Sequence, residues 1–182
     1  PGGAVDSLDG QIDLAAPLAA PCPDRLMERT DGQSPDALAV AAIRELWEET
    51  GLILGHKTAW SAPDPTWDSF ARAGFQPDAR DLHYFFRAIT PPGRPRRFDA
   101  RFFLLQAEKL TGDLDDFSAA SDELSHLQWV RLKDARALNL PFITSVVLAE
   151  LDGLDAIGAP PSVPFFENTD EASLFHRLGR NA

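Results

Sequence analysis

The segment from Ser34 to Leu52 constrains this chain more than any other part of its sequence. Ser34 is a favoured helix N-cap residue, and Pro35 suits the first helical position because its missing N–H would have no partner there. Asp36 adds a negative charge where the helix dipole favours an anion. Gly51 is suited to the left-handed conformation that ends a helix. The sequence therefore predicts a helix with both ends marked.

This predicted helix has an apolar side and an acidic side. At about 100° per residue, the apolar side consists of Val40, Ile43, Leu46 and Trp47. Glu45, Glu48 and Glu49 gather on another side, since residues three and four apart are neighbours on a helix surface. Like charges at this spacing destabilise a helix, and only Arg44 offsets them locally. The cluster is therefore either a solvated acidic face or a site for a hard divalent cation, Mg²⁺ or Mn²⁺.

The acidic half of this helix resembles the core of the Nudix box, whose pattern is G-x5-E-x7-R-E-U-x-E-E-x-G-U with U aliphatic. It runs Arg44-Glu45-Leu46-Trp47-Glu48-Glu49-Thr50-Gly51-Leu52. The chain also opens Pro1-Gly2-Gly3, and Asp9 follows Gly3 after five residues, where the pattern has Glu. Between Asp9 and Arg44 lie 34 residues, 27 more than the seven of the pattern. The resemblance therefore implies a Nudix hydrolase whose box is split by an insertion.

The resemblance also implies the fold, an α/β fold of the Nudix type in which a mixed β-sheet lies in an α/β/α sandwich. Interleaved strand-like and helix-like segments favour the same class. We expect a single domain over residues 1–182, with the insertion at about 10–34 and a strand ahead of Pro1 that the sequence does not include. The insertion is either a tolerated surface excursion or a functional lid, and we expect it to pack beside the catalytic cleft.

Periodicity and composition predict the remaining elements. Strands are expected at 52–54, 83–89, 100–108 and 127–132, and helices at 64–74, around 133–138 and at 141–154. In the strand 83–89, Tyr84 and Phe86 are expected on one face, with Phe85 and Arg87 on the other. The end of the chain is expected to be an extended arm, followed by one or two helical turns at 171–178.

The resemblance assigns roles to residues of the box. The metal ligands that it implies are Gly3, through its carbonyl, and the side chains of Glu45, Glu48 and Glu49. Arg44, Glu45 and Glu48 would form the catalytic core, with Arg44 orienting Glu45. Asp9 is one methylene shorter than the family Glu, and its role after such an insertion is left open.

One further carboxylate is expected from outside the box. Glu123 lies in a predicted loop ahead of a late strand, where many relatives supply an additional acid. One helix face cannot surround an ion that prefers octahedral oxygens, so Glu123 would bind the metal or act as general base through a water. The alternative is that Glu123 is a solvated acid like its neighbour Asp122.

A local excess of arginine interrupts this acidic chain. Its members, proposed as contacts for substrate phosphate, are Arg94, Arg96, Arg97 and Arg101. The planar guanidinium matches phosphate oxygens, so at least one of them is expected to grip the diphosphate or a further phosphate. The alternative is a set of surface ion pairs that contribute little.

Composition limits the classes of partner. A formal net charge of −11 over 182 residues argues against non-specific nucleic-acid binding and against binding to an anionic membrane. The single cysteine, Cys22, cannot form an internal disulfide, and there is no apolar run of about 18 residues. We therefore expect a cytoplasmic protein without nucleic-acid or membrane partners, and with a homodimer as its candidate assembly.

The resemblance implies hydrolysis of a nucleoside diphosphate derivative, so the expected partner is a small-molecule nucleotide diphosphate. Further likenesses to the split-box branch that includes peroxisomal coenzyme A diphosphatases are Ile89-Thr90-Pro91-Pro92, Arg96-Arg97-Phe98-Asp99, Phe102-Phe103, Glu123 ahead of Trp129, and Leu140-Pro141-Phe142. Coenzyme A or acyl-coenzyme A is therefore the leading substrate, with ADP-ribose, NADH or another nucleotide sugar as alternatives. From other classes, a catalytically inactive nucleotide sensor and a structural interaction domain remain open.

Overall fold

A computed structural model describes residues 1–30, 32–135, 137–154 and 158–179. The helices are α1 (Cys22–Met27), α2 (Pro35–Thr50), α3 (Asp68–Arg72), α4 (Leu132–Ala135) and α5 (Phe142–Asp152). The strands are β1 (Gly55–Lys57), β2 (Phe75–Pro77), β3 (His83–Ile89), β4 (Asp99–Leu104), β5 (Val163–Asn168) and β6 (Ser173–Leu178). Single 3₁₀ turns occur at Asp9–Gln11, Pro65–Trp67 and Ala107–Lys109. No helix within these ranges is long and apolar enough to span a bilayer.

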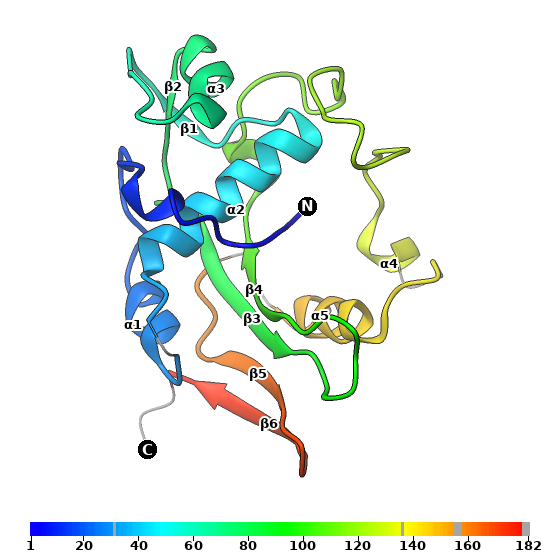
Figure 1. The fold of residues 1–182 in the computed structure, drawn as a ribbon. Coiled ribbons are helices and arrows are strands. Elements are labelled where there is room, and N and C mark those ends of the chain that lie inside the picture. Colours follow the sequence, from blue (N-terminus) through cyan, green and yellow to red (C-terminus); the bar gives the residue numbers. More distant parts are fainter. Residues whose placement is uncertain (31, 136, 155–157, 180–182) are drawn as a thin grey trace.

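The main sheet has four strands in the order β4-β3-β5-β6 (Figure 1). β3 is antiparallel to β4 and parallel to β5, and β6 is antiparallel to β5. The sheet is therefore mixed, as predicted. β1 and β2 form a separate antiparallel pair next to α3.

Helices cover both faces of the main sheet. On one face, side chains of α1 and α2 share a core with Tyr84 of β3 and Phe165 of β5. On the other face, α5 contributes Val146 to a second core that contains Phe85 and Phe86. These two layers of helix around a mixed sheet confirm the predicted α/β/α sandwich.

The alternation predicted for β3 is interrupted by a register irregularity between Tyr84 and Phe86. Phe85 and Phe86 both lie in the core on the α5 side, whereas Tyr84 lies in the other core. The guanidinium of Arg87 stacks 4.4 Å from the ring centroid of Phe165, on the Tyr84 side. The prediction that Tyr84 and Phe86 share one face of the strand, and Phe85 and Arg87 the other, is therefore wrong. An extra residue in the strand shifts the period-two alternation of side chains.

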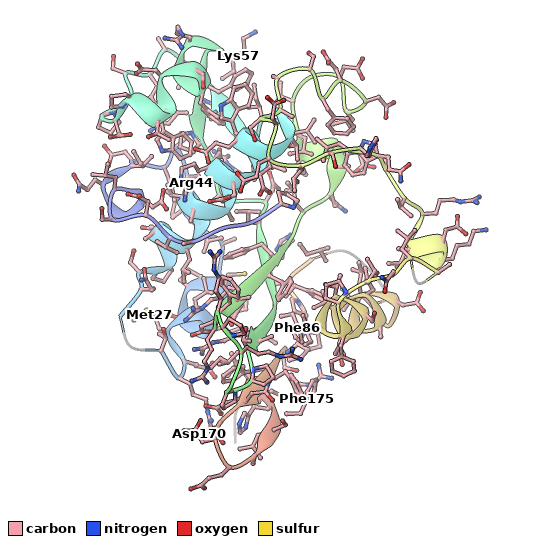
Figure 2. The ribbon with its side chains drawn as sticks, turned by 45° about the vertical axis from the view of Figure 1, so that its right-hand side comes forward. Met27, Arg44, Lys57, Phe86, Asp170 and Phe175 are labelled. Carbon is pink, nitrogen blue, oxygen red and sulfur yellow. The ribbon has the colours of Figure 1, made fainter. Side chains whose placement is uncertain are left out.

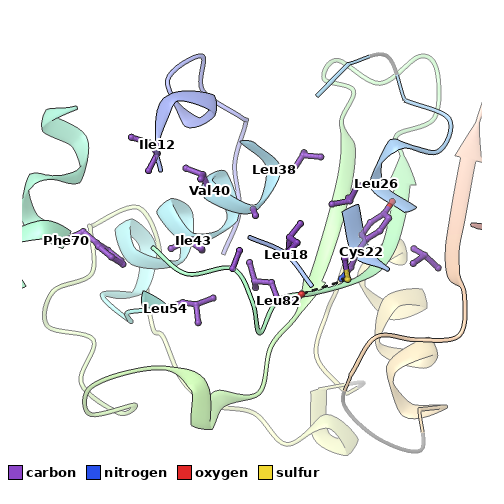
Figure 3. Close-up of a cluster of buried hydrophobic side chains, with 14 of the residues drawn as sticks. Ile12, Leu18, Cys22, Leu26, Leu38, Val40, Ile43, Leu54, Phe70 and Leu82 are labelled. Atoms are coloured by element: carbon purple, nitrogen blue, oxygen red, sulfur yellow. Dashed lines mark hydrogen bonds between the residues drawn. The ribbon is translucent and has the colours of Figure 1, made fainter. Parts of the chain in front are cut away.

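The insertion at about 10–34 contributes to the core. Leu18, Cys22 and Leu26 are buried and pack with α2 and β3 (Figure 3). The N–H of Tyr84 donates to the Cys22 Sγ across 3.3 Å, which joins α1 to β3 directly. The interpretation of this segment as a surface excursion is therefore wrong. If the segment opened as a lid, these side chains would have to leave the close-packed core.

The end of the chain forms two strands, where an arm and a helical turn were predicted. β5 and β6 complete the sheet, and Phe165 and Leu178 are buried in the larger core. Pro164 argued against a strand because proline cannot donate to a ladder. In the structure the pairing of β5 with β3 begins at Phe165, opposite Arg87, so the missing N–H of Pro164 removes no bond to β3.

The strand predicted at 127–132 is not present. The backbone there is irregular until α4 begins at Leu132, and the side chain of Trp129 is half exposed, with its Nε1 donating to the Leu114 carbonyl. Periodicity alone could not reveal that this segment pairs with no strand of the described chain. Arg136, which belongs to the helical stretch predicted around 133–138, lies outside the described residues.

Other predicted elements are confirmed in type and shifted at their ends. β3 occupies the predicted 83–89, and α5 lies within 141–154. Trp67 and Phe70 are buried, as the helical spacing at 64–74 indicated. The predicted strand 52–54 contains only an isolated bridge at Ile53, and β4 ends at Leu104. Such boundary shifts follow from tertiary pairing, which decides where a strand gains and loses its partner.

We predict that Leu26→Ala lowers the free energy of unfolding by about 2–5 kcal/mol, because Leu26 is 1% exposed and its truncation leaves a cavity in the core. The neighbouring Met27 is 50% exposed, so Met27→Ala is the matched control with an effect within about 0.5 kcal/mol. Urea denaturation monitored by circular dichroism measures both variants. Equal stability of Leu26→Ala and the parent protein would contradict the core role of the insertion.

Candidate functional site

Helix α2 has the ends that the sequence predicts. The Ser34 hydroxyl accepts from the Ala37 N–H across 3.0 Å, with Pro35 at the first helical position. Gly51 has φ +73° and donates its N–H to the Trp47 carbonyl across 2.8 Å. These two caps fix where the helix begins and ends, and with it the positions of its carboxylates.

Arg44 lies on α2 (Figure 2), and its guanidinium contacts several carboxylates. Its Nε and Nη2 donate to the two oxygens of Asp9 across 3.0 and 3.1 Å, a bidentate pair. Its Nη1 donates to Glu45 Oε1 across 2.8 Å and to Glu48 Oε2 across 3.1 Å. A further bond runs from Nη2 to the Ala4 carbonyl across 2.9 Å. One guanidinium therefore joins three carboxylates and the first loop of the chain.

The structure gives Asp9 the definite role that the sequence left open. Its side chain is 2% exposed and also accepts from the Asp6 N–H across 2.7 Å. Asp9 lies in a 3₁₀ turn that packs against α2, so the shorter side chain still reaches Arg44 across the 34-residue gap. Asp9 and Arg44 together rebuild the connection between the two halves of the box.

The electrostatics of the cluster favour an additional positive charge. Burial lowers the pKa of Arg44, but the hydrogen bonds and charges of Asp9, Glu45 and Glu48 outweigh it and raise the pKa above its ordinary value. Burial raises the pKa of Glu48, and the charges of Glu45 and Asp9 act in the same direction, against Arg44. Carboxylates outnumber the single guanidinium, so a cation at this site would relieve their mutual repulsion.

The Gly2–Gly3 segment lies against the carboxylates of α2. The Gly2 N–H donates to Glu49 Oε2 across 2.8 Å, and the Glu49 side chain is only 7% exposed. A Cβ placed on Gly3 would collide with the carboxylate of Glu45. A side chain at this position would therefore displace Glu45, so the close approach requires glycine.

The carboxylates of α2 are ligands of the kind that a hard divalent cation takes, but in this structure their oxygens contact protein groups. Among the residues described, no three Asp, Glu, His or Cys side chains lie together in a geometry able to hold a metal ion. Glu45 and Glu48 accept from Arg44, and Glu49 accepts from Gly2. Carboxylate oxygens beside a bare glycine backbone are the ligands that Mg²⁺ and Mn²⁺ prefer. Metal binding by these residues stays a prediction.

The loop that carries Glu123 contacts the carboxyl end of α2. The Ser121 N–H donates to the Glu48 carbonyl across 2.8 Å, two residues before Glu123. Glu123 itself is exposed, and its N–H lies 3.5 Å from the Ser121 hydroxyl. Its role as ligand or base stays a prediction. No sequence signal pointed to Ser121, because its contact is made through the backbone.

The arginines proposed as phosphate contacts do not gather at the carboxylates. The tip of the β3–β4 hairpin, which carries Arg94, Arg96 and Arg97, lies at the far end of the sheet from the carboxyl end of α2 (Figure 1). Arg97 donates to the Thr90 and Asn168 carbonyls. Arg94 and Arg96 are exposed, and phosphate contact by either stays a prediction.

Arg101 makes structural contacts with its side chain, and phosphate contact by Arg101 stays a prediction. Its side chain is 9% exposed; Nη1 pairs with Asp99 and Nη2 donates to the Thr30 hydroxyl across 3.0 Å. Burial lowers the pKa of Arg101, with Asp99 opposing this and Arg87 adding to it. Arg87 also pairs with Asp99 and donates to the Arg29 carbonyl across 2.8 Å. These bonds tie the end of the insertion to β3 and β4, just ahead of α2.

Comparison with known proteins points to one family. The NUDIX domain family model matches residues 33–151. The Caenorhabditis elegans protein named "Putative nudix hydrolase 7" is 30% identical over 125 residues, which are 62% of this chain and 41% of that protein. The chain thus spans about two fifths of that relative's length. A crystal structure of a NUDIX hydrolase from Alicyclobacillus acidocaldarius aligns with a TM-score of 0.48 and 22% identity, over 81% of this chain and 72% of that one.

We predict that Asp9→Asn lowers the free energy of unfolding by about 3 kcal/mol, because it leaves the largely buried Arg44 without its bidentate carboxylate. Asp13 is exposed on the same segment, so Asp13→Asn is the matched control and should change stability by less than about 0.5 kcal/mol. Denaturant titration measures both. If the two variants were equally stable, the Asp9–Arg44 pair would not hold the first loop to α2.

Proposed function

The chain belongs to the Nudix family, and we propose that it is an enzyme that uses Mg²⁺ or Mn²⁺ to hydrolyse the diphosphate linkage of a nucleoside diphosphate derivative. The observation that carries this proposal is the cluster around Arg44, in which one guanidinium holds Asp9, Glu45 and Glu48 together. The carboxylates gathered beside the Gly2–Gly3 segment support an active site over a solvated acidic face.

The proposed ligands of the divalent ion are the side chains of Glu45, Glu48 and Glu49 and the carbonyl of Gly3. When bound, such an ion neutralises the negative oxygens that repel an attacking water and polarises the phosphorus–oxygen bond. Arg44 would orient Glu45 and Glu48, and Asp9 would hold Arg44 in place. The dense hydrogen bonding supports this division between ligands and residues that position them.

Glu123 is the proposed general base. A carboxylate on the loop that bonds to the Glu48 carbonyl would accept the proton of the attacking water or complete the ion's oxygen ligands. Its exposure leaves the side chain free to turn toward a substrate bound at the end of α2. What supports the proposal is the attachment of this loop to the helix end that carries Glu48.

Coenzyme A or an acyl-coenzyme A is the leading substrate, supported by the sequence likeness to the split-box coenzyme A diphosphatases. ADP-ribose, NADH and nucleotide sugars are the alternatives within the same reaction class. The second candidate function is a nucleotide sensor without catalysis. It is favoured by Asp9, which stands where the motif has Glu, and by the 34 residues that separate Asp9 from Arg44.

A panel of coenzyme A, acetyl-coenzyme A, ADP-ribose, NADH and a nucleotide sugar, each assayed with Mg²⁺ and with Mn²⁺, separates these possibilities. Release of a nucleotide product from any of them supports the enzyme, and preference for coenzyme A supports the finer assignment. Tight binding of a panel member without turnover under either metal would contradict the enzyme and favour the sensor.

We predict that Glu49→Gln lowers the metal-dependent rate about 100-fold or more, because the amide removes a charged ligand while keeping an acceptor for Gly2. Glu108 is exposed on the 3₁₀ turn after β4, and Glu108→Gln is the matched control that keeps the parent rate. Chromatography of the nucleotide product measures the rate, and thermal unfolding verifies the fold. Turnover of Glu49→Gln at the parent rate would remove Glu49 from the site.

For Glu123, we predict that Glu123→Gln lowers kcat by about 100-fold or more, as expected when a general base is lost. The adjacent Asp122→Asn, equally exposed, should leave kcat within about twofold of the parent. Steady-state kinetics on the best substrate of the panel measures both. Equal kcat for the two variants would reduce Glu123 to a solvated acid.

A further inference from the structure

The last turn of α2 carries two of the proposed metal ligands, and a distant loop supplies part of its cap. A helix ends with four carbonyls that have no partner within the helix. At the end of α2, the Gly51 N–H donates to the Trp47 carbonyl. The Glu48 carbonyl is satisfied by the Ser121 N–H, 2.8 Å away and 73 residues later in the chain.

The same loop packs against the residue that ends the helix. Gly51 is in the left-handed region, and a Cβ built on it would lie 2.9 Å from the Ala119 Cβ and 3.2 Å from the Ala120 nitrogen. Any side chain at 51 would therefore push the loop away. The glycine and the small Ala119 together allow the backbone of the loop to reach the Glu48 carbonyl.

The loop is held at its base and within itself. The Thr111 N–H donates to the Ile53 carbonyl across 2.9 Å, which ties the start of the loop to the segment after α2. The Trp129 Nε1 donates to the Leu114 carbonyl across 2.8 Å, so the two arms of the loop meet. The Ala120 N–H closes a turn onto the Phe117 carbonyl. The loop therefore contacts the helix as a constrained unit.

We propose that Ser121 is a positioning residue, whose backbone N–H keeps the last turn of α2 formed and so fixes where the Glu48 and Glu49 carboxylates lie. The assignment of these two carboxylates rests on the proposed function; the cap itself does not. Terminal turns fray first because they have the fewest internal bonds. Loss of the cap would let Glu48 and Glu49 move relative to Glu45, one turn earlier, without disturbing the core.

The test compares Ser121→Pro with Ser121→Ala in the full chain. Both variants lose the hydroxyl, and with it the 3.5 Å contact to the Glu123 N–H, but only proline removes the N–H that caps Glu48. Amide hydrogen exchange at residues 48–51 should be about tenfold faster in Ser121→Pro than in Ser121→Ala, as expected for the loss of one hydrogen bond. Exchange in β3 should be the same in both.

Kinetics supplies the second measurement. On the best substrate of the panel, kcat of Ser121→Pro should fall about tenfold below that of Ser121→Ala, with KM unchanged, because the chemical step depends on the placement of the carboxylates. A purely structural role would lower the active fraction and the melting temperature instead. Ala119→Leu, which crowds Gly51 without touching the N–H, should speed exchange at 48–51 in the same way if Ser121→Pro does not fold.

Each outcome decides a separate question. Exchange at residues 48–51 that is no faster in Ser121→Pro, or in its substitute Ala119→Leu, than in Ser121→Ala would overturn the cap. Faster exchange with unchanged kcat would overturn the positioning role while leaving the cap in place. A parent protein that hydrolyses no member of the panel would remove the proposed function, and with it the positioning role, whereas the exchange measurement would still establish or reject the cap.

Discussion

The pairing of Asp9 with Arg44 is the interaction on which the site depends. It joins the N-terminal segment to α2 through two hydrogen bonds from the half-buried Arg44 to the buried Asp9, and it lies where the insertion separates the two partners by 34 residues. Because Arg44 also holds Glu45 and Glu48, the position of the Gly2–Gly3 segment and the position of the carboxylates are set together. A charge-assisted bidentate pair supplies both the energy and the orientation that this requires.

The insertion is anchored at each end, so the two halves of the split motif lie side by side. At its start Asp9 binds Arg44, and at its end Arg87 and Arg101 bind the segment around Thr30. Between these anchors, the side chain of Leu26 enters the core under α2. The added residues therefore pack against α2, in keeping with the slow growth of loop-closure entropy with length. Asp99 has a further part, since it neutralises the two arginines that would otherwise repel each other.

The carboxylates of α2 face two competing kinds of partner. Arg44 and the Gly2 N–H satisfy Glu45, Glu48 and Glu49 in the present arrangement, yet the raised pKa of Glu48 reflects burial and an excess of negative charge. A divalent ion offers more charge than a guanidinium shared among several acids. If the proposed metal binds, these carboxylates would exchange their hydrogen-bond donors for the cation, while Arg44 keeps its bidentate bond to Asp9.

What the sequence by itself determined are the features with short-range causes. The caps Ser34 and Gly51, the glutamate spacing on α2 and the extent of β3 follow from hydrogen bonds and periodicity within a few residues, and the structure has them as predicted. The match to the Nudix box likewise depended on consecutive residues, from Arg44 to Leu52. Only the tertiary structure decided that Glu49 is buried under Gly2 and that Arg101 braces the insertion. It also decided that β5 and β6 complete the sheet, and that the Ser121 N–H caps the Glu48 carbonyl at the end of α2. These depend on partners tens of residues away, and a local pattern contains no information on which distant donor or strand the fold will bring to it.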